Sequence, residues 1–187
     1  MMKRLVVFVA ILFGFFLNIV SANHIVPDYN CDDNNRIFRI SEATNAHGEV
    51  YNGAGNYPIS ICYDDYFGAI TQPPNRACSQ ANTAVIRLSG NTNAHAERPG
   101  GTTIGYTNIC FESLLCRLVT SPNTCNPVTE HEIVFLSSTT NAHIELPGAG
   151  GKYNRKICCS IDPGTTLPNF SYSQWQDYNG NVIEEGQ

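Results

Sequence analysis

A seven-residue motif that returns at a constant interval is the strongest constraint on the fold of this chain. Its three copies share the pattern Thr-Asn-Ala-His-x-Glu and occupy residues 43–49, 91–97 and 139–145. Successive copies lie 48 residues apart, and the same interval separates Cys62 from Cys110 and Cys110 from Cys158. Chance rarely produces such spacing. We therefore expect one supersecondary unit, built three times and stabilised by contacts between the copies.

The first 22 residues have the composition of a secretory signal peptide. Met1–Arg4 carries two basic side chains, Leu5–Leu17 is continuously apolar, and Val20-Ser21-Ala22 offers the small residues that a signal peptidase recognises. A retained membrane anchor is the alternative, but the apolar stretch is at the short limit for crossing a bilayer. We therefore predict an exported protein, secreted or at the cell surface, with no membrane contact after cleavage of residues 1–22.

Residues 23–187 have the length of a single domain. Its units are predicted at about residues 31–77, 78–124 and 125–163, followed by a C-terminal strand segment at 164–187. Gly, Asn, Thr, Ser, Pro and Tyr are abundant and helix formers are scarce, which favours strands and turns. The net charge of −5, with no cluster of basic residues, argues against nucleic acid as a partner.

All eight cysteines follow the predicted cleavage point, and an even number in an exported chain indicates disulfides. Six of them follow the repeat, one opening and one closing each unit. Antiparallel strands bring each opening cysteine beside the closing one. We expect the pairs Cys31–Cys62, Cys78–Cys110, Cys125–Cys158 and, from the two cysteines left over, Cys116–Cys159. Pairing between neighbouring units is the alternative, because it keeps the same symmetry. A zinc site at Cys158-Cys159 is disfavoured, since adjacent residues on a strand point to opposite faces.

Each unit contains two runs of β-forming residues, one before the motif and one after a glycine-rich stretch. The first runs are residues 37–41, 85–89 and 133–137, and the second runs are 57–63, 106–111 and 153–159. They predict long antiparallel hairpins, with a third strand in each of the connections 64–80 and 112–126. The expected fold is therefore all-β, an antiparallel β-sandwich or short open stack of three disulfide-linked hairpins. A closed β-trefoil is the alternative.

The repeated motif also holds the candidate functional side chains. Asn suits an Asx turn, and His and Glu two residues apart share one side of an extended segment. The candidates are Asn45, His47, Glu49, Asn93, His95, Glu97, Asn141, His143 and Glu145. In the structural interpretation, Asn closes the turn while His and Glu bond to the glycine-rich return. In the alternative, His and Glu bind a divalent metal ion. A metal site takes three or four ligands, so at least two of the loops have to converge.

Several observations argue against catalysis, and we predict that the protein is not an enzyme. The chain has no G-x-S-x-G, H-E-x-x-H or P-loop motif, and no cofactor is expected apart from a divalent cation. A catalytic constellation is asymmetric, whereas the motif here is repeated. Asn169-Phe170-Ser171 is the single N-x-S/T sequence and makes Asn169 a candidate for glycosylation.

The segment Leu136–Pro147, followed by Lys156-Ile157-Cys158-Cys159, resembles a repeat of exported, largely uncharacterised proteins of archaea and some bacteria. The resemblance covers about residues 35–63, 83–111 and 131–159. It implies a surface or extracellular role without naming an activity. The first two units depart from it by ending in Cys62-Tyr63 and Cys110-Phe111, so any role of the double cysteine belongs to the third unit.

Together these features predict a non-enzymatic structural protein, a cell-surface or extracellular filament subunit that assembles with copies of itself through β-strands. The alternative is a secreted carbohydrate- or metal-binding module, in which aromatic side chains beside the Asn-rich loops contact glycans. Those side chains are Tyr51, Tyr57, Tyr106, Tyr153 and Trp175. Convergence of the three His loops favours the binding module, whereas loops along an exposed edge favour assembly.

Overall fold

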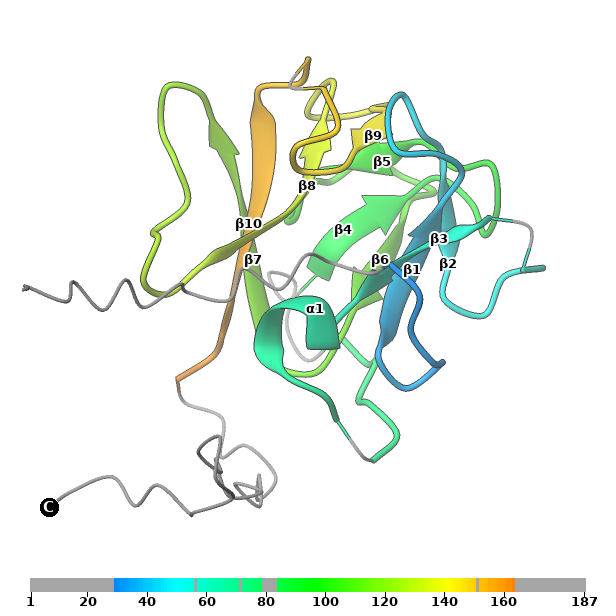
Figure 1. The fold of residues 1–187 in the computed structure, drawn as a ribbon. Coiled ribbons are helices and arrows are strands. Elements are labelled where there is room, and N and C mark those ends of the chain that lie inside the picture. Colours follow the sequence, from blue (N-terminus) through cyan, green and yellow to red (C-terminus); the bar gives the residue numbers. More distant parts are fainter. Residues whose placement is uncertain (1–28, 56, 71, 79–83, 151, 164–187) are drawn as a thin grey trace, which may run out of the picture.

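The computed structural model describes residues 29–55, 57–70, 72–78, 84–150 and 152–163. The predicted signal peptide, the C-terminal strand segment and Asn169 lie outside the described residues. Within them the chain forms three antiparallel sheets and one short helix (Figure 1). The all-β, antiparallel prediction is confirmed.

The three sheets share one plan, in which the first strand of a unit lies between the two strands that follow it. The first sheet has the order β2(Gly48–Val50), β1(Arg36–Ile40), β3(Ile59–Cys62). The second has the order β5(Ala96–Glu97), β4(Ala84–Leu88), β6(Thr107–Cys110). The third has the order β9(Ile144–Glu145), β8(His131–Leu136), β10(Arg155–Ile161), β7(Leu114–Thr120).

The end of each repeated motif forms a short strand, where the sequence pattern predicted a loop. In all three units these residues fold back onto the free edge of the first strand. The registers are equivalent, because Arg39 pairs with Glu49, Arg87 with Glu97 and Phe135 with Glu145. The predicted hairpin is present as well, since β3, β6 and β10 pair antiparallel with the other edge.

The short strands also join the three units to one another. Isolated backbone bridges pair Ala46 with Ile144, Gly48 with Ala94, and Ala96 with Ala142. Each unit is thereby bridged to both of the others, and the arrangement closes on itself, as β5 and β9 lying side by side illustrate (Figure 1). The preferred open stack is therefore wrong in this respect. The β-trefoil alternative shares the closure, but two of the three described units lack the fourth strand that a trefoil needs.

Equivalent residues of the three units meet in one hydrophobic core. Ile40, Leu88 and Leu136, which occupy the same repeat position, are completely buried, and each first strand contributes neighbours to the same cluster. Close packing forces one departure from symmetry. A Cβ atom at Gly48 would lie 2.6 Å from Cδ2 of Leu88 and 3.4 Å from Cδ1 of Ile144, the residue equivalent to Gly48 in the third unit. A large side chain from one unit thus fills the space that glycine leaves in another.

The end of the core away from the motif is closed differently in the three units. Tyr63 and Phe111, at equivalent positions, stack with their ring centroids 5.0 Å apart. The third equivalent is Cys159, which forms a disulfide with Cys116. All three side chains are buried. A disulfide therefore occupies the position that an aromatic ring fills in the other units.

The four disulfides have the connectivity that the cysteine spacing predicts. The pairs are Cys31–Cys62, Cys78–Cys110, Cys125–Cys158 and Cys116–Cys159. Cys158 and Cys159 point to opposite faces of β10, since Cys159 belongs to the main core and Cys158 to a small separate cluster with Val119. No described cysteine is free. Four disulfides indicate that the protein folds in an oxidising, extracellular type of environment.

The connections between units differ from one another. The predicted third strand is present in the second connection as β7, which pairs with β10 along its whole length. In the first connection the prediction of a third strand is wrong, because the helix α1(Asp64–Phe67) forms instead. Two acidic residues begin this single turn, and Gly68 ends it with a φ of 87°. Among the described residues, no helix is long and apolar enough to span a bilayer.

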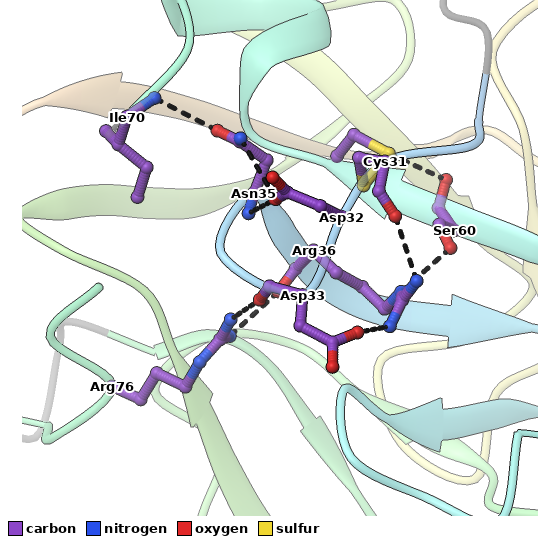
Figure 2. Close-up of a disulfide and its surroundings, with 9 residues drawn as sticks. Cys31, Asp32, Asp33, Asn35, Arg36, Ser60, Ile70 and Arg76 are labelled. Carbon is purple, nitrogen blue, oxygen red and sulfur yellow. Dashed lines mark hydrogen bonds and ion pairs between the residues drawn. A yellow bond between two sulfur atoms is a disulfide. The ribbon is translucent and has the colours of Figure 1, made fainter. Parts of the chain in front are cut away.

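Arg76 fixes the connection between the first two units to the beginning of β1. Its guanidinium donates to the backbone carbonyl oxygens of Asp33 and Arg36 at 2.6 and 2.8 Å (Figure 2). The same group stacks 3.7 Å from the ring centroid of Tyr51 and 4.8 Å from that of Phe111. Two hydrogen bonds and two aromatic contacts therefore depend on one planar cation.

The Asp33–Arg36 turn is itself anchored to the first disulfide. Arg36 donates to the carbonyl oxygen of Cys31 at 2.9 Å and to Oγ of Ser60 at 3.0 Å, and it forms an ion pair with Asp33 (Figure 2). The disulfide, β1, β3 and the connection held by Arg76 consequently form one hydrogen-bonded corner of the molecule.

Replacing Arg76 with alanine is expected to lower the free energy of unfolding by about 1–2 kcal/mol, because it removes these hydrogen bonds and the cation–π contacts. Arg76→Lys restores the charge but not the fork of donors, so it is expected to recover only part of the loss. Urea denaturation monitored by tyrosine and tryptophan fluorescence measures both. Arg98→Ala is the control, since Arg98 is exposed and its guanidinium donates to the carbonyl oxygen of the adjacent Pro99 at 3.4 Å. Equal losses for the two alanine variants would contradict this account.

Candidate metal centre

The closed arrangement brings one histidine from each unit together. The ring centroids of His47, His95 and His143 lie 4.8 to 5.0 Å from one another. Nε2 of His47 lies 3.2 Å from Nε2 of His95, and one ring nitrogen from each of the three histidines lies within 4.8 Å of the others. All three side chains are partly buried. We refer to them below as the histidine cluster.

A hydrogen-bonded turn presents each histidine to the cluster. In the first unit the Ser41 N–H donates to the carbonyl oxygen of His47 at 3.1 Å, and the His47 N–H donates to Oγ of Ser41 at 3.0 Å. Ser89 bonds His95 and Ser137 bonds His143 in the same two ways, at 2.9 to 3.0 Å. The serine hydroxyl therefore satisfies the backbone donor of the residue that carries the ring.

The asparagine of each motif supplies the left-handed backbone that this turn requires. Asn45, Asn93 and Asn141 have φ values of 55°, 48° and 47°. Asn tolerates this region better than most residues other than Gly. The predicted turn is present, but the side chain that closes it belongs to serine. The serines were missed, although their fixed position six residues before each histidine was visible in the sequence.

Bridges between units hold the backbone on both sides of each histidine. The residue before His47 exchanges two hydrogen bonds with Ile144 of the third unit, at 2.8 and 2.9 Å. The residue after it exchanges two with Ala94 of the second unit, at 2.8 and 3.0 Å. The ring is thus attached between two fixed points, and folding alone brings the three rings together.

The surroundings of His47 favour its neutral imidazole. Burial and the neighbouring rings of His143 and His95 lower the pKa of His47, and only the carboxylate of Glu42 acts in the opposite direction. Nδ1 of His143 lies 3.0 Å from the carbonyl oxygen of Asn45. A carbonyl only accepts, so Nδ1 carries a proton and Nε2 is the nitrogen of this ring that is able to bind a metal ion. A neutral ring with one nitrogen fixed in this way is the form in which histidine binds a metal ion.

Asn45 connects the cluster to the third unit a second time. Its Oδ1 accepts a hydrogen bond from the hydroxyl of Tyr153 at 3.1 Å. The side chain of Asn45 therefore braces the same turn whose carbonyl oxygen orients His143, and it lies at the exposed rim of the cluster.

The glutamates of the motif do not join the histidines. Glu49, Glu97 and Glu145 are buried within their own units, with exposed fractions of 0%, 1% and 0%. Glu97 forms an ion pair with Arg87 and accepts a hydrogen bond from Thr103 Oγ1 at 2.6 Å. Of the two interpretations of the motif, the bond to the glycine-rich return describes Glu97 and Glu145, whereas both carboxylate oxygens of Glu49 are buried without a hydrogen-bond partner. Convergence describes the histidines.

The third unit lacks the arginine partner of its glutamate. Arg39 lies 3.6 Å from Glu49 and Arg87 pairs with Glu97, but the equivalent position holds Phe135, which packs against Lys156. Glu145 accepts one bond from the Lys152 N–H at 3.2 Å, and its Oε2 is buried with no hydrogen-bond partner. The three glutamates therefore differ in charge compensation although they occupy one repeat position.

The remaining candidates are engaged elsewhere. The groups Cys31, Cys62, Asp64 and Cys125, Glu130, Cys158 are close enough for a metal ion, but their cysteines are in disulfides and offer no thiolate. Among the aromatic side chains predicted as glycan platforms, the Tyr51 ring is covered by Arg76. Trp175 lies outside the described residues.

Glu97→Gln is expected to destabilise the protein by about 2 kcal/mol at pH 7, because Arg87 loses its buried counter-charge. Burial raises the pKa of Glu97, but hydrogen bonds from Thr103 and the charge of Arg87 outweigh it and lower the net value. The carboxylate therefore stabilises the fold above pH about 4.5, and this contribution is lost as the pH falls through the lowered folded-state pKa. The difference between wild type and variant should narrow accordingly in urea titrations between pH 7 and 3.

Glu145→Gln is the matched control for this experiment, because the same substitution at the equivalent position removes no arginine pair. We expect it to cost clearly less than Glu97→Gln at pH 7. Equal costs at the two positions would show that the ion pair with Arg87 contributes nothing.

Comparison with protein-family models, with curated proteins and with solved structures finds no match for this chain. The resemblance to exported archaeal and bacterial repeat proteins therefore stays a prediction, and the function has to be inferred from the histidine cluster itself.

Proposed function

We propose that this protein is an exported binding module that holds one divalent transition-metal ion with His47, His95 and His143. One observation carries the proposal. Three histidines, each 48 residues from the next in sequence, direct ring nitrogens to within 4.8 Å of one another. Side chains that only packed together would not need three identical turns, each hydrogen-bonded to present a nitrogen-bearing ring at the same point.

The distances suit a tetrahedral ion. Two nitrogens bound at 2.0–2.1 Å in that geometry lie about 3.4 Å apart. Nε2 of His47 and Nε2 of His95 are separated by 3.2 Å. An all-imidazole set selects Zn²⁺, Cu²⁺, Ni²⁺ or Co²⁺, whereas Mg²⁺ and Ca²⁺ require oxygen ligands.

A bound ion would link the three units to one another. The three ligands come from the three turns, so the ion would connect them where the disulfides do not, because all four disulfides lie at the other ends of the strands or outside the motif. Binding to the folded state alone adds to its stability, by about 2.7 kcal/mol at a free metal concentration a hundred times the Kd.

Secretion or display at the cell surface is part of the proposal. The predicted signal peptide and the four disulfides support export. Assembly into a filament remains a separate prediction. Among the described strands β7 lies at the edge of its sheet, where a further strand is able to pair. The histidines themselves converge inside one molecule, which favours binding over assembly for the repeated motif.

Isothermal titration of the oxidised, untagged protein with Zn²⁺ at pH 7.5 tests the proposal. We expect one ion per chain and a rise in thermal stability that EDTA reverses. His95→Asn is expected to weaken binding by more than about 100-fold, since loss of outer-shell partners alone costs 10–100-fold. His47→Asn and His143→Asn should behave alike.

His131→Asn is the matched control. His131 lies outside the cluster and contacts Phe67, with ring centroids 5.0 Å apart. Its replacement should leave the affinity for Zn²⁺ within about twofold of wild type, because additivity holds for distant sites. Wild-type protein that binds no Zn²⁺, or binding that survives all three cluster substitutions, would exclude the proposed function.

A further inference from the structure

The histidine cluster supplies three ligands and no fourth. Among the described residues, the group of donor atoms within 4.8 Å of one another at this point consists of His47, His95 and His143 alone. A structural zinc site is closed by four protein ligands, whereas three protein ligands leave a position for water or another small ligand. We propose that the ion bound by these histidines keeps one coordination position open and takes up a small anion from solution. This inference rests on the proposed function.

The open position faces outward. The residues that precede the histidines in the chain, Ala46, Ala94 and Ala142, are buried, with exposed fractions of 0%, 1% and 0%, and their backbone groups are occupied by the bridges between units. These buried backbone groups therefore offer no further ligand to the ion. On the outer side the rim includes Asn45, whose carbonyl oxygen lies 3.0 Å from Nδ1 of His143, and the equivalent residues Asn93 and Asn141 are exposed as well. A ligand from solution consequently reaches the ion from the rim.

The protein is unable to close the position by a small movement. Each histidine is attached between two inter-unit bridges, and its turn is held by the serine hydroxyl. The carboxylates nearest in sequence, Glu49, Glu97 and Glu145, are buried within their own units. Moving Glu49 or Glu97 to the ion would leave Arg39 or Arg87 without its partner. Glu145 has no arginine partner, but it is completely buried and its Oε1 accepts a hydrogen bond from the Lys152 N–H.

Charge selects the class of ligand. Three neutral imidazoles leave the two positive charges of the ion uncompensated, so a small monodentate anion is favoured over a neutral molecule of the same size. One rim carboxylate opposes this preference. Glu42 is exposed, it acts electrostatically on His47, and its equivalents in the other units are Gly90 and Ser138. The rim is therefore asymmetric in charge although the ligands are symmetric.

Cobalt substitution with azide as the probe tests this inference. The oxidised protein is loaded with one equivalent of Co²⁺, and its visible spectrum is followed as azide is added. We expect a saturable change that fits one azide per Co²⁺. His95→Asn should abolish the visible spectrum itself, which shows that the signal comes from the cluster.

Glu42→Gln provides the charge-specific control. Removal of one exposed negative charge at the rim is expected to tighten azide binding by about twofold, in line with the small effects of exposed charges. The affinity for imidazole, a neutral ligand for the same position, should not change. Equal effects on azide and imidazole would overturn the role of charge in selecting the ligand.

The outcomes separate this inference from the proposed function. A Co²⁺ spectrum that depends on the histidines but does not respond to azide would contradict the open coordination position, while the proposal of metal binding would stand. Metal-dependent dimers in sedimentation velocity would overturn it as well, because a second copy then fills the position. Failure of Co²⁺ and Zn²⁺ to bind at all would exclude the proposed function first.

Discussion

The backbone bridges between the three repeated motifs hold the units of this fold together. Ala46, Ala94 and Ala142 each pair with a residue of another unit, and together these bridges close three separate sheets into one domain. Their small side chains let the backbones approach, and burial keeps the hydrogen bonds away from water. The common core and the meeting of the histidines both follow from this closure, because every histidine lies between two bridged residues.

Symmetry is kept where the bridges require it and abandoned elsewhere. The serine–histidine turn and the left-handed asparagine recur in all three units. In the core, equivalent positions hold different residues, such as Gly48 and Ile144 or Tyr63 and Cys159. A packed interior tolerates such differences because the total side-chain volume matters more than the identity of each residue. The third unit, with Phe135 in place of arginine and β7 added to its sheet, departs furthest.

Much of the fold was predictable from local pattern. The pairs of β-forming runs correspond to the two long strands of each hairpin, and the spacing of the cysteines corresponds to the four disulfides. The failures were of a different kind. The short apolar segment after Asp64 fits a strand and a helix equally well by its sequence pattern, and it forms the helix α1, which ends at Gly68. The residues of β2, β5 and β9 are strands only because each of them pairs with the edge of a longer strand.

Local sequence pattern is sufficient to predict the parts of each unit, which are its two long strands, its disulfide and the turn that carries a histidine. These are short-range properties, set by backbone preferences and by residues that the hairpin brings together. Tertiary packing closes the units into a ring, places Glu49 and Glu97 beside Arg39 and Arg87, and brings the three histidines together. Those outcomes depend on which unit packs on which, and a repeat that stacks openly has the same local pattern as one that closes.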